Sequence, residues 1–197
     1  MYDRWVKEAS MGNLNGVVLI DLSAAFDLVD HDILLQKLKI YGLQADIVQL
    51  IESYLSEREQ AVWIDNTLSE FLPVNVGVPQ GSILGSLLFL AFFNDLPFHT
   101  VNPVDSYADD TTVTATGRSL EELEVKLTED CKNVSNWMKA NKLKMNAEKT
   151  HILVMSTQRR LSSLDRQLEI KIDGQVLKST KCEKLLGCTV SCNLKWN

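Results

Sequence analysis

Residues 104–116 read VDSYADDTTVTAT, two runs that favour β-strands on either side of the adjacent acids Asp109 and Asp110. Asp is tolerated in tight turns, and the side chains of a hairpin turn project from the end of a sheet. The sequence therefore predicts a hairpin that exposes both carboxylates together. Two neighbouring carboxylates repel each other unless a cation or solvent lies between them. The pair indicates either a cation site or an ordinary polar turn.

The rest of the chain alternates predicted helices and strands. Helical spacing is found at 31–42, 45–57, 85–96 and, most clearly, 119–143, where Ser119 and Glu122 predict a capping box. The helix at 85–96 is apolar nearly all round, which predicts that it is buried. Asp46 is expected to cap the helix at 45–57, and Gly42 to end the helix before it.

Short apolar runs predict β-strands. They are found at 16–22, 60–65, 69–77, 150–155, 168–178 and 184–190. Turns are predicted at Asn66 and at Asp173–Gly174. Because hairpins are interleaved with helices, we expect an α+β fold, an antiparallel sheet with helices packed on one face.

Composition is typical of one folded domain over 1–197. The 197 residues are 45% hydrophobic and 23% charged, and no linker rich in Gly, Pro or Ser divides them. The N-terminus lacks the features of a signal peptide, and the longest apolar run, at 83–93, is too short to span a bilayer. We expect an intracellular, soluble protein without membrane contact.

Cysteine spacing and charge each leave two interpretations open. Cys182, Cys188 and Cys192 lie close together in sequence, but no fourth ligand follows, which favours buried thiols over a zinc site. Residues 1–115 hold 5 Lys or Arg against 16 Asp or Glu, whereas residues 116–197 hold 15 against 10. The basic half, which includes Arg159, Arg160 and Arg166, is either a solvated face or a surface that meets nucleic-acid phosphates.

A third acid, Asp21, stands at the end of the predicted strand at 16–22. Together with Asp109 and Asp110 it would complete an oxygen-rich site of the kind that Mg²⁺ prefers. Two such ions can activate an attacking hydroxyl and stabilise a leaving phosphate.

Five segments resemble, in order and spacing, the palm motifs of reverse transcriptases, most closely those of non-LTR (LINE-type) retrotransposons. They are VVLIDLSAAFDLVDH (17–31), GVPQGSILGSLLF (77–89), YADD (107–110), LKMNAEKT (143–150) and KLLG (184–187). The resemblance implies a polymerase palm in which Asp21 and Asp109, 88 positions apart (109 minus 21), coordinate two Mg²⁺ ions, with Asp110 assisting. Mn²⁺ would be a possible substitute.

The same resemblance implies a nucleotide site. Phe26 would pack under the sugar of the incoming nucleotide and exclude a 2′-hydroxyl, although it could equally be a core residue. Pro79, Gln80 and Gly81 would form the turn beside the nucleotide, where Gln80 can donate or accept a hydrogen bond and glycine lets the backbone approach. Taken alone, these three residues would be an ordinary loop.

Two further assignments follow from the resemblance. Lys149 would donate a proton to the leaving pyrophosphate, a sensible role for a general acid, or it is simply a surface lysine. Leu186 and Gly187 would belong to the hairpin that grips the primer end, or they form a bare turn.

Two positions depart from the family pattern. Ser86 stands where proline is usual, and serine is a good helix cap, so we expect it to begin a helix. Leu28 stands where a small or polar residue is usual, which matters if its side chain faces the site. The resemblance also implies that most of the fingers, the thumb and an endonuclease segment of a parent polyprotein are missing.

Three functions stay open. The first is an RNA-directed DNA polymerase palm, which adds dNTPs to a DNA primer on an RNA template and, for a retrotransposon, acts in the nucleus. The second is an inactive remnant or a domesticated module that binds nucleic acid or a protein. The third is another palm-type enzyme, such as a diguanylate cyclase or an RNA-templated RNA polymerase. The chain lacks the Gly-Gly-acid-Glu-Phe turn of the cyclases, and Phe26 disfavours ribonucleotides.

Overall fold

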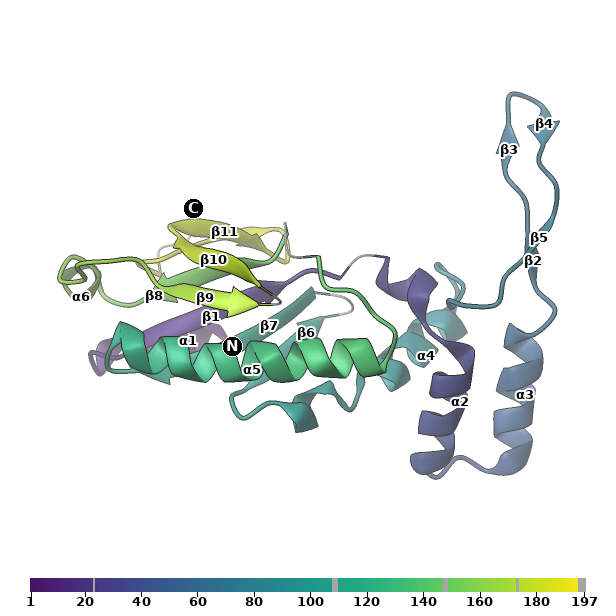
Figure 1. Cartoon of the computed structure of the whole chain (residues 1–197), viewed down its shortest axis with the longest axis horizontal. Helices are drawn as coiled ribbons and strands as arrows, with labels where there is room; N and C mark the ends of the chain where they lie inside the picture. Colours follow the sequence, from purple (N-terminus) through teal and green to yellow (C-terminus); the bar gives the residue numbers. More distant parts are fainter. Residues whose placement is uncertain (23, 108–109, 147–148, 173, 195–197) are drawn as a thin grey trace. The chain divides into compact units, whose positions relative to one another are not determined.

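The structure is a computed structural model, and its chain forms two compact units (Figure 1). It describes residues 1–22, 24–107, 110–146, 149–172 and 174–194. The sheet unit comprises residues 1–23, 95–140 and 144–197, and the helical unit comprises residues 24–94 and 141–143.

A six-stranded sheet in the order β6-β7-β1-β8-β10-β9 forms the centre of the sheet unit. Its strands are β1 (Leu14–Ile20), β6 (Val104–Tyr107), β7 (Asp110–Gly117), β8 (His151–Met155), β9 (Glu169–Ile172) and β10 (Gln175–Thr180). Neighbouring strands are antiparallel except β8 and β10, which pair in parallel. Nearly every residue of β1 is buried, as expected for a central strand covered on both faces.

The long helix α5 (Leu120–Ala140) covers one face of the sheet (Figure 1). Ser119 Oγ accepts a hydrogen bond from the Glu122 amide at 3.3 Å, which confirms that Ser119 caps the helix. The Glu122 carboxylate accepts from the Arg118 amide at 2.7 Å rather than from the Ser119 amide, so the second bond of the predicted capping box is replaced by one to the preceding residue. The apolar stripe predicted from its spacing is buried. A Cβ added to Gly16 would lie 2.7 Å from Leu127 Cδ1, so the glycine lets α5 lie directly on β1.

The opposite face is covered by α1 (Tyr2–Ser10), where the sequence pattern predicts no helix, and by the hairpin of β11 (Cys182–Leu185) and β12 (Cys188–Ser191). Trp5 is 1% exposed and belongs to a buried cluster with Val17, Leu153, Met155 and Val190. Side chains alternate along a strand, so Val17 and Gly16 point to opposite faces. The α+β class is therefore confirmed, with helices on both faces of the sheet rather than on one.

The helical unit contains three α-helices among the described residues, namely α2 (His31–Ile40), α3 (Ala45–Leu55) and α4 (Ile83–Phe93). Asp30 caps α2, because its Oδ1 accepts a hydrogen bond from the Ile33 amide at 3.0 Å, and its Oδ2 also lies 2.6 Å from Lys142 Nζ. Burial would raise the pKa of Asp30, but the hydrogen bonds from Lys142 and Ile33 outweigh it and lower that pKa below its ordinary value.

Three local predictions in this unit have mixed outcomes. Gly42, with φ of +87°, follows α2 as predicted. Asp46 lies in the first turn of α3, and Gln44 occupies the cap position, so the predicted cap is wrong. Ser82 rather than Ser86 caps α4, since Ser82 Oγ accepts a hydrogen bond from the Gly85 amide at 2.9 Å.

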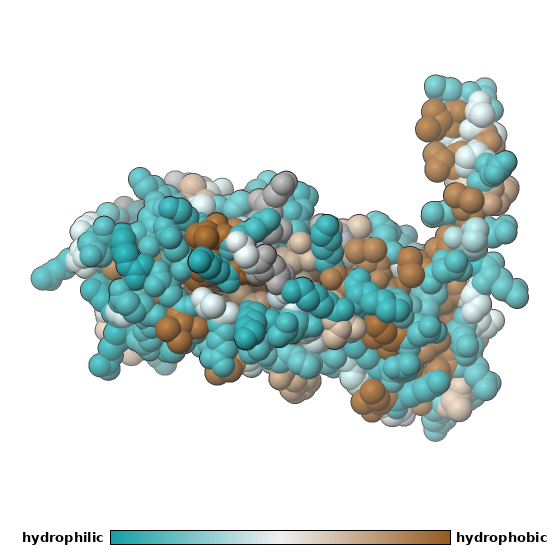
Figure 2. Space-filling model, in the orientation of Figure 1, coloured by the Kyte–Doolittle hydropathy of each residue, from teal (hydrophilic) through white to brown (hydrophobic). Residues whose placement is uncertain are grey.

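The helical unit exposes much apolar surface. The predicted turn is confirmed: Asp65 and Asn66 have positive φ and link β3 (Trp63–Ile64) to β4 (Thr67–Leu68), beyond the pair β2 (Glu59–Gln60) and β5 (Leu72–Pro73). Figure 2 shows hydrophobic residues gathered on this hairpin. The expectation that α4 is buried all round is wrong. The exposed hydrophobic residues on α4 are Ile83, Leu87 and Leu90.

Short helices and the cysteines complete the description. The short helices are η1 (Ala25–Leu28), η2 (Leu96–His99) and α6 (Gln158–Leu161). Cys131 is buried, and burial and then the charge of Asp130 raise the pKa of its thiol to about 12. Cys182 and Cys188 are exposed, so the expectation of buried thiols fails for them. No helix in the described part of the chain has both the length and the apolar character to cross a membrane.

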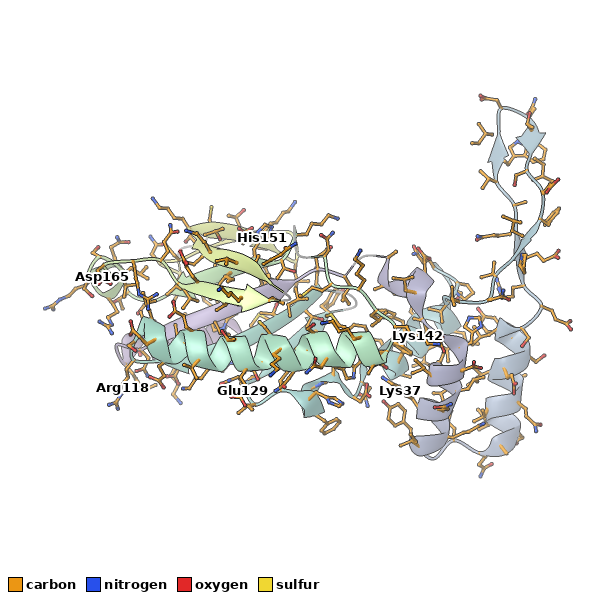
Figure 3. The ribbon with its side chains drawn as sticks, viewed as in Figure 1. Lys37, Arg118, Glu129, Lys142, His151 and Asp165 are labelled. Atoms are coloured by element: carbon orange, nitrogen blue, oxygen red, sulfur yellow. The ribbon has the colours of Figure 1, made fainter. Side chains whose placement is uncertain are left out.

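Asp130 on α5 provides a stability test of the sheet unit. Its side chain is fully buried and accepts hydrogen bonds at 2.8 Å from the Val101 amide and from Asn102 Nδ2. Asp130→Ala should lower the free energy of unfolding by about 2–3 kcal/mol, because it removes two hydrogen bonds to a fully buried carboxyl group. Urea denaturation measures this, with Glu129→Ala, an exposed neighbour (Figure 3), as the control that changes stability by less than about 0.5 kcal/mol. Equal losses in both variants would contradict the assigned role.

Candidate active site

Two acids of the sheet unit come together at one end of the central strands. β1 and β7 are antiparallel with Ile20 opposite Thr111, and the next residues outward are Asp21 and Asp110. Both acids line a pocket of about 270 Å³. The predicted hairpin is also confirmed, because β6 pairs with β7 and Tyr107 lies opposite Asp110. Pairing of the two strands thus brings together acids that are far apart in the sequence.

The segment that carries Lys149 is tied to Asp21. The Asn146 amide donates a hydrogen bond to the Asp21 carbonyl at 2.9 Å, and Leu22 forms a β-bridge with Met145. Lys149 Nζ lies 3.9 Å from Asp21 Oδ2, and both side chains reach solvent. A pair of this kind contributes little to stability, but it places a proton donor beside the acids.

Asp21 and Asp110, the two predicted metal ligands among the described residues, suit a hard divalent cation. Asp109 lies outside the described residues, and within them no three His, Cys, Asp or Glu side chains form a metal-binding group. Asp21 and Asp110 offer carboxylate oxygens, the donors that Mg²⁺ and Mn²⁺ prefer. This donor set suits such an ion, and the third ligand expected from the sequence is Asp109.

The same pocket contains a side-chain contact that sequence reasoning missed. His151 Nδ1, from β8, lies 3.6 Å from Glu183 Oε1, from β11 (His151 is labelled in Figure 3). His151 is opposite Leu19 in the register of β8 against β1. No local signal in the sequence shows this pairing, since it depends on strands joined by long connections. This contact joins β8 to the β11–β12 hairpin at the pocket.

Leu186 and Gly187 form the two-residue turn of that hairpin. Leu185 pairs with Cys188, and Leu186 and Gly187 have φ of +49° and +82°. Leu186 is 51% exposed, and a left-handed conformation is unfavourable for leucine. Contact with a primer end stays a prediction for these two residues.

The remaining predicted site residues belong to the helical unit. Phe26, in η1, is half-buried and stacks on Phe89 with ring centroids 4.1 Å apart. Its ring is therefore packed on one side and partly exposed, so the structure is compatible with both interpretations of Phe26. Leu28, at the end of η1, is half-buried.

The turn at Pro79, Gln80 and Gly81 precedes α4. Gly81 has φ of +77°, a conformation that favours glycine, and a Cβ there would meet nothing within 4 Å. The Gln80 side chain is exposed and donates a hydrogen bond to Asp27 Oδ1 at 3.1 Å. The roles of these residues toward a nucleotide stay predictions.

Part of the basic charge of the second half of the chain is paired within the protein. Arg166 binds Glu121 and Glu124, and the backbone amide of Glu121 and then Arg166 lower the pKa of Glu121 to about 2. Lys126 pairs with Glu122 at 2.7 Å. These ion pairs balance part of the charge within the protein, and contact of the basic half with nucleic-acid phosphates stays a prediction.

Comparison with protein families matches residues 5–190 to "Reverse transcriptase (RNA-dependent DNA polymerase)". Because this match covers most of the chain, the chain belongs to the reverse transcriptase family. It is 34% identical over 181 residues to the "Probable RNA-directed DNA polymerase from transposon BS" of Drosophila melanogaster, covering 88% of this chain and 20% of that protein. It is 32% identical over 187 residues to the "RNA-directed DNA polymerase from mobile element jockey" of the same organism, covering 90% of this chain and 20% of that protein.

These matches confirm the resemblance to reverse transcriptases of non-LTR retrotransposons. The chain spans about a fifth of the length of these relatives. Among solved structures, apo telomerase from Candida tropicalis, truncated from its C-terminal domain, matches with a TM-score of 0.66 at 14% identity. That match covers 100% of this chain and 39% of the telomerase chain, and it shows a shared fold.

The turn at Leu186 provides a test of the hairpin. Leu186→Asn should raise the free energy of unfolding by about 1 kcal/mol, because Asn-Gly suits a two-residue turn with positive φ. Val176→Asn, an exposed apolar residue of β10, is the control and should be neutral or slightly destabilising. Chemical denaturation of both variants measures the difference. If Leu186→Asn loses as much stability as Val176→Asn, the assignment of Leu186 and Gly187 to a two-residue turn is contradicted.

Proposed function

We propose that the chain is the catalytic palm of an RNA-directed DNA polymerase, which adds dNTPs to the 3′-hydroxyl of a DNA primer on an RNA template. The observation that carries the proposal is the pocket shared by Asp21, Asp110 and Lys149 at the end of β1 and β7. Membership of the reverse transcriptase family and the names of the two Drosophila relatives support it.

In this proposal Asp21, Asp109 and Asp110 hold the metal ions. Two Mg²⁺ ions bound there would activate the primer hydroxyl and stabilise the leaving pyrophosphate. Lys149, whose Nζ is 3.9 Å from Asp21, is placed to give a proton to the leaving group. The chain thus supplies the ligands and the acid from three separate segments.

Phe26 would select the sugar by a steric clash built against ribonucleotides. Its ring is stacked on Phe89, which in turn stacks on Phe93 with centroids 5.0 Å apart. A ring held by this stack cannot easily move aside for a 2′-hydroxyl. This rigidity supports DNA rather than RNA as the product.

The proposal extends to the parent protein. We place the chain in a retrotransposon polyprotein that acts in the nucleus and supplies thumb, further fingers and endonuclease segments. The support is that the chain covers 20% of each of the two Drosophila relatives. Leu186 and Gly187 would contact the primer end in that assembly.

Primer extension tests the proposed activity. The chain, an RNA template, a DNA primer and dNTPs should give Mg²⁺-dependent extension, which Asp21→Asn and Asp110→Asn lower at least about 100-fold, because each removes a metal ligand. Asp165→Asn, an exposed acid of the sheet unit (Figure 3), is the control and should retain full activity. If the wild-type chain extends no primer, or if Asp21→Asn and Asp110→Asn extend it at the wild-type rate, the alternative of a non-catalytic module replaces this proposal.

Sugar selection is tested separately with Phe26→Val. The variant should raise the efficiency of ribonucleotide relative to deoxynucleotide incorporation by about tenfold or more, because the smaller side chain leaves room for the 2′-hydroxyl. Activity with each nucleotide and the melting temperature are measured together. If Phe26 is only a core residue, the melting temperature falls, both activities fall together and their ratio stays constant.

A further inference from the structure

The turn that carries Gln80 is fastened to the segment that carries Phe26, within the helical unit. The Val78 amide donates to the Phe26 carbonyl and the Gly77 amide to the Val29 carbonyl, each at 2.8 Å. His31 Nε2 is 2.8 Å from the Gly77 carbonyl oxygen, at hydrogen-bond distance. Hydrogen bonds to backbone atoms of the turn therefore hold it in place without any contribution from the side chains of the turn.

Gly77 brings the turn into direct contact with Asp27. Gly77 has φ of +89°, and a Cβ there would lie 2.9 Å from both the Cα and the carbonyl oxygen of Asp27. Real Cβ atoms do not approach backbone atoms so closely, and the conformation itself favours glycine. The close approach sets the position of the turn relative to Asp27.

The side chain of Asp27 then reaches Gln80. Gln80 Nε2 donates to Asp27 Oδ1 at 3.1 Å, and in the described part of the chain Asp27 is the one hydrogen-bond partner of this carboxamide. An ionised carboxylate only accepts hydrogen bonds, so the amide nitrogen, not the amide oxygen, must face it. Oε1 and the second N–H of Gln80 are left for another molecule.

Both side chains border an open cleft. Asp27 and Gln80 line a cavity of about 550 Å³ within the helical unit, together with the polar residues Arg58, Glu59, Gln60 and Asn75. A cavity of this size is within the range that holds small-molecule ligands. The carboxamide thus borders a space that a ligand can enter.

We propose that Asp27 is a positioning residue that fixes the orientation of the Gln80 carboxamide toward the incoming nucleotide. The inference rests on the proposed function, in which Gln80 lies beside that nucleotide. Asp27 follows Phe26 in η1, so one short helix would carry both the ring under the sugar and the acid that orients the amide. Without the carboxylate, the amide can turn over and present nitrogen where oxygen is needed.

The substitution Asp27→Asn isolates this role. Asparagine has nearly the same shape, but it can donate as well as accept, so both orientations of the Gln80 amide become possible. The backbone hydrogen bonds of the turn are untouched, and the melting temperature should therefore stay within about 2 °C. Asp46→Asn, the same change at an exposed acid of α3, is the matched control.

Side-chain amide NMR tests the hydrogen bond without any activity. The Gln80 NH₂ resonances, assigned by their loss in Gln80→Ala, should shift in Asp27→Asn and stay in place in Asp46→Asn. Unchanged Gln80 resonances in Asp27→Asn, or equal shifts in both variants, would overturn the proposal.

Steady-state primer extension tests the consequence for the nucleotide. Asp27→Asn should raise the KM for dNTP about five- to tenfold and leave kcat within about twofold, and in a Gln80→Ala background it should have no further effect, because Asp27 acts through Gln80. Additive effects in the double variant would show that Asp27 acts on its own and would overturn the proposal. If the wild-type chain extends no primer, the proposed function fails, and the NMR result alone decides whether Asp27 orients Gln80.

Discussion

The antiparallel pairing of β1 with β7 is the constraint on which the candidate site depends. The register from Leu14 opposite Gly117 to Ile20 opposite Thr111 decides which residues emerge at the end of the two strands. A shift of one residue would turn every side chain to the other face and would separate Asp21 from Asp110. β1 is held in this register because its apolar side chains are covered on both faces, by α5 on one and by α1 on the other.

The helical unit depends on a second constraint of the same kind. The turn at 77–81 is held to the segment 26–31 by backbone hydrogen bonds, and Gly77 permits the close approach. Phe26 and Gln80, the residues proposed to contact the nucleotide, are thereby carried on one pair of segments joined by hydrogen bonds. Rigidity of this type lets a few exposed side chains keep a defined geometry without being buried.

Much of the fold and of the site could be predicted from local patterns in the sequence. The spacing on α5, the turn at Asn66 and the hairpin around Asp110 follow from period and turn chemistry, which act over a few residues. The cover of the second face by α1, the parallel pair β8 and β10, and the pair of His151 with Glu183 could not be predicted. Each of them depends on contacts between distant segments, for which one sequence carries no local signal.

The prediction that α4 is buried all round failed for a different reason. An apolar sequence does not by itself show that a helix is buried, because apolar atoms also make up much of a folded protein's surface. In α4, Ile83, Leu87 and Leu90 are exposed. The expectation that Ser86 begins α4 came from the position where proline is usual in the family, and that position lies inside the helix. The cap is Ser82, because its Oγ accepts the hydrogen bond from the Gly85 amide.

The central claim is that β1 and β7 together present one cation site, and paramagnetic broadening by Mn²⁺ tests it most directly. At substoichiometric Mn²⁺, amide resonances of Leu19–Leu22 and of Thr111–Thr112 should broaden together, and Asp21→Asn should abolish the effect at both strand ends. Broadening at only one of the two strand ends, or broadening that Asp21→Asn leaves unchanged, would contradict the account.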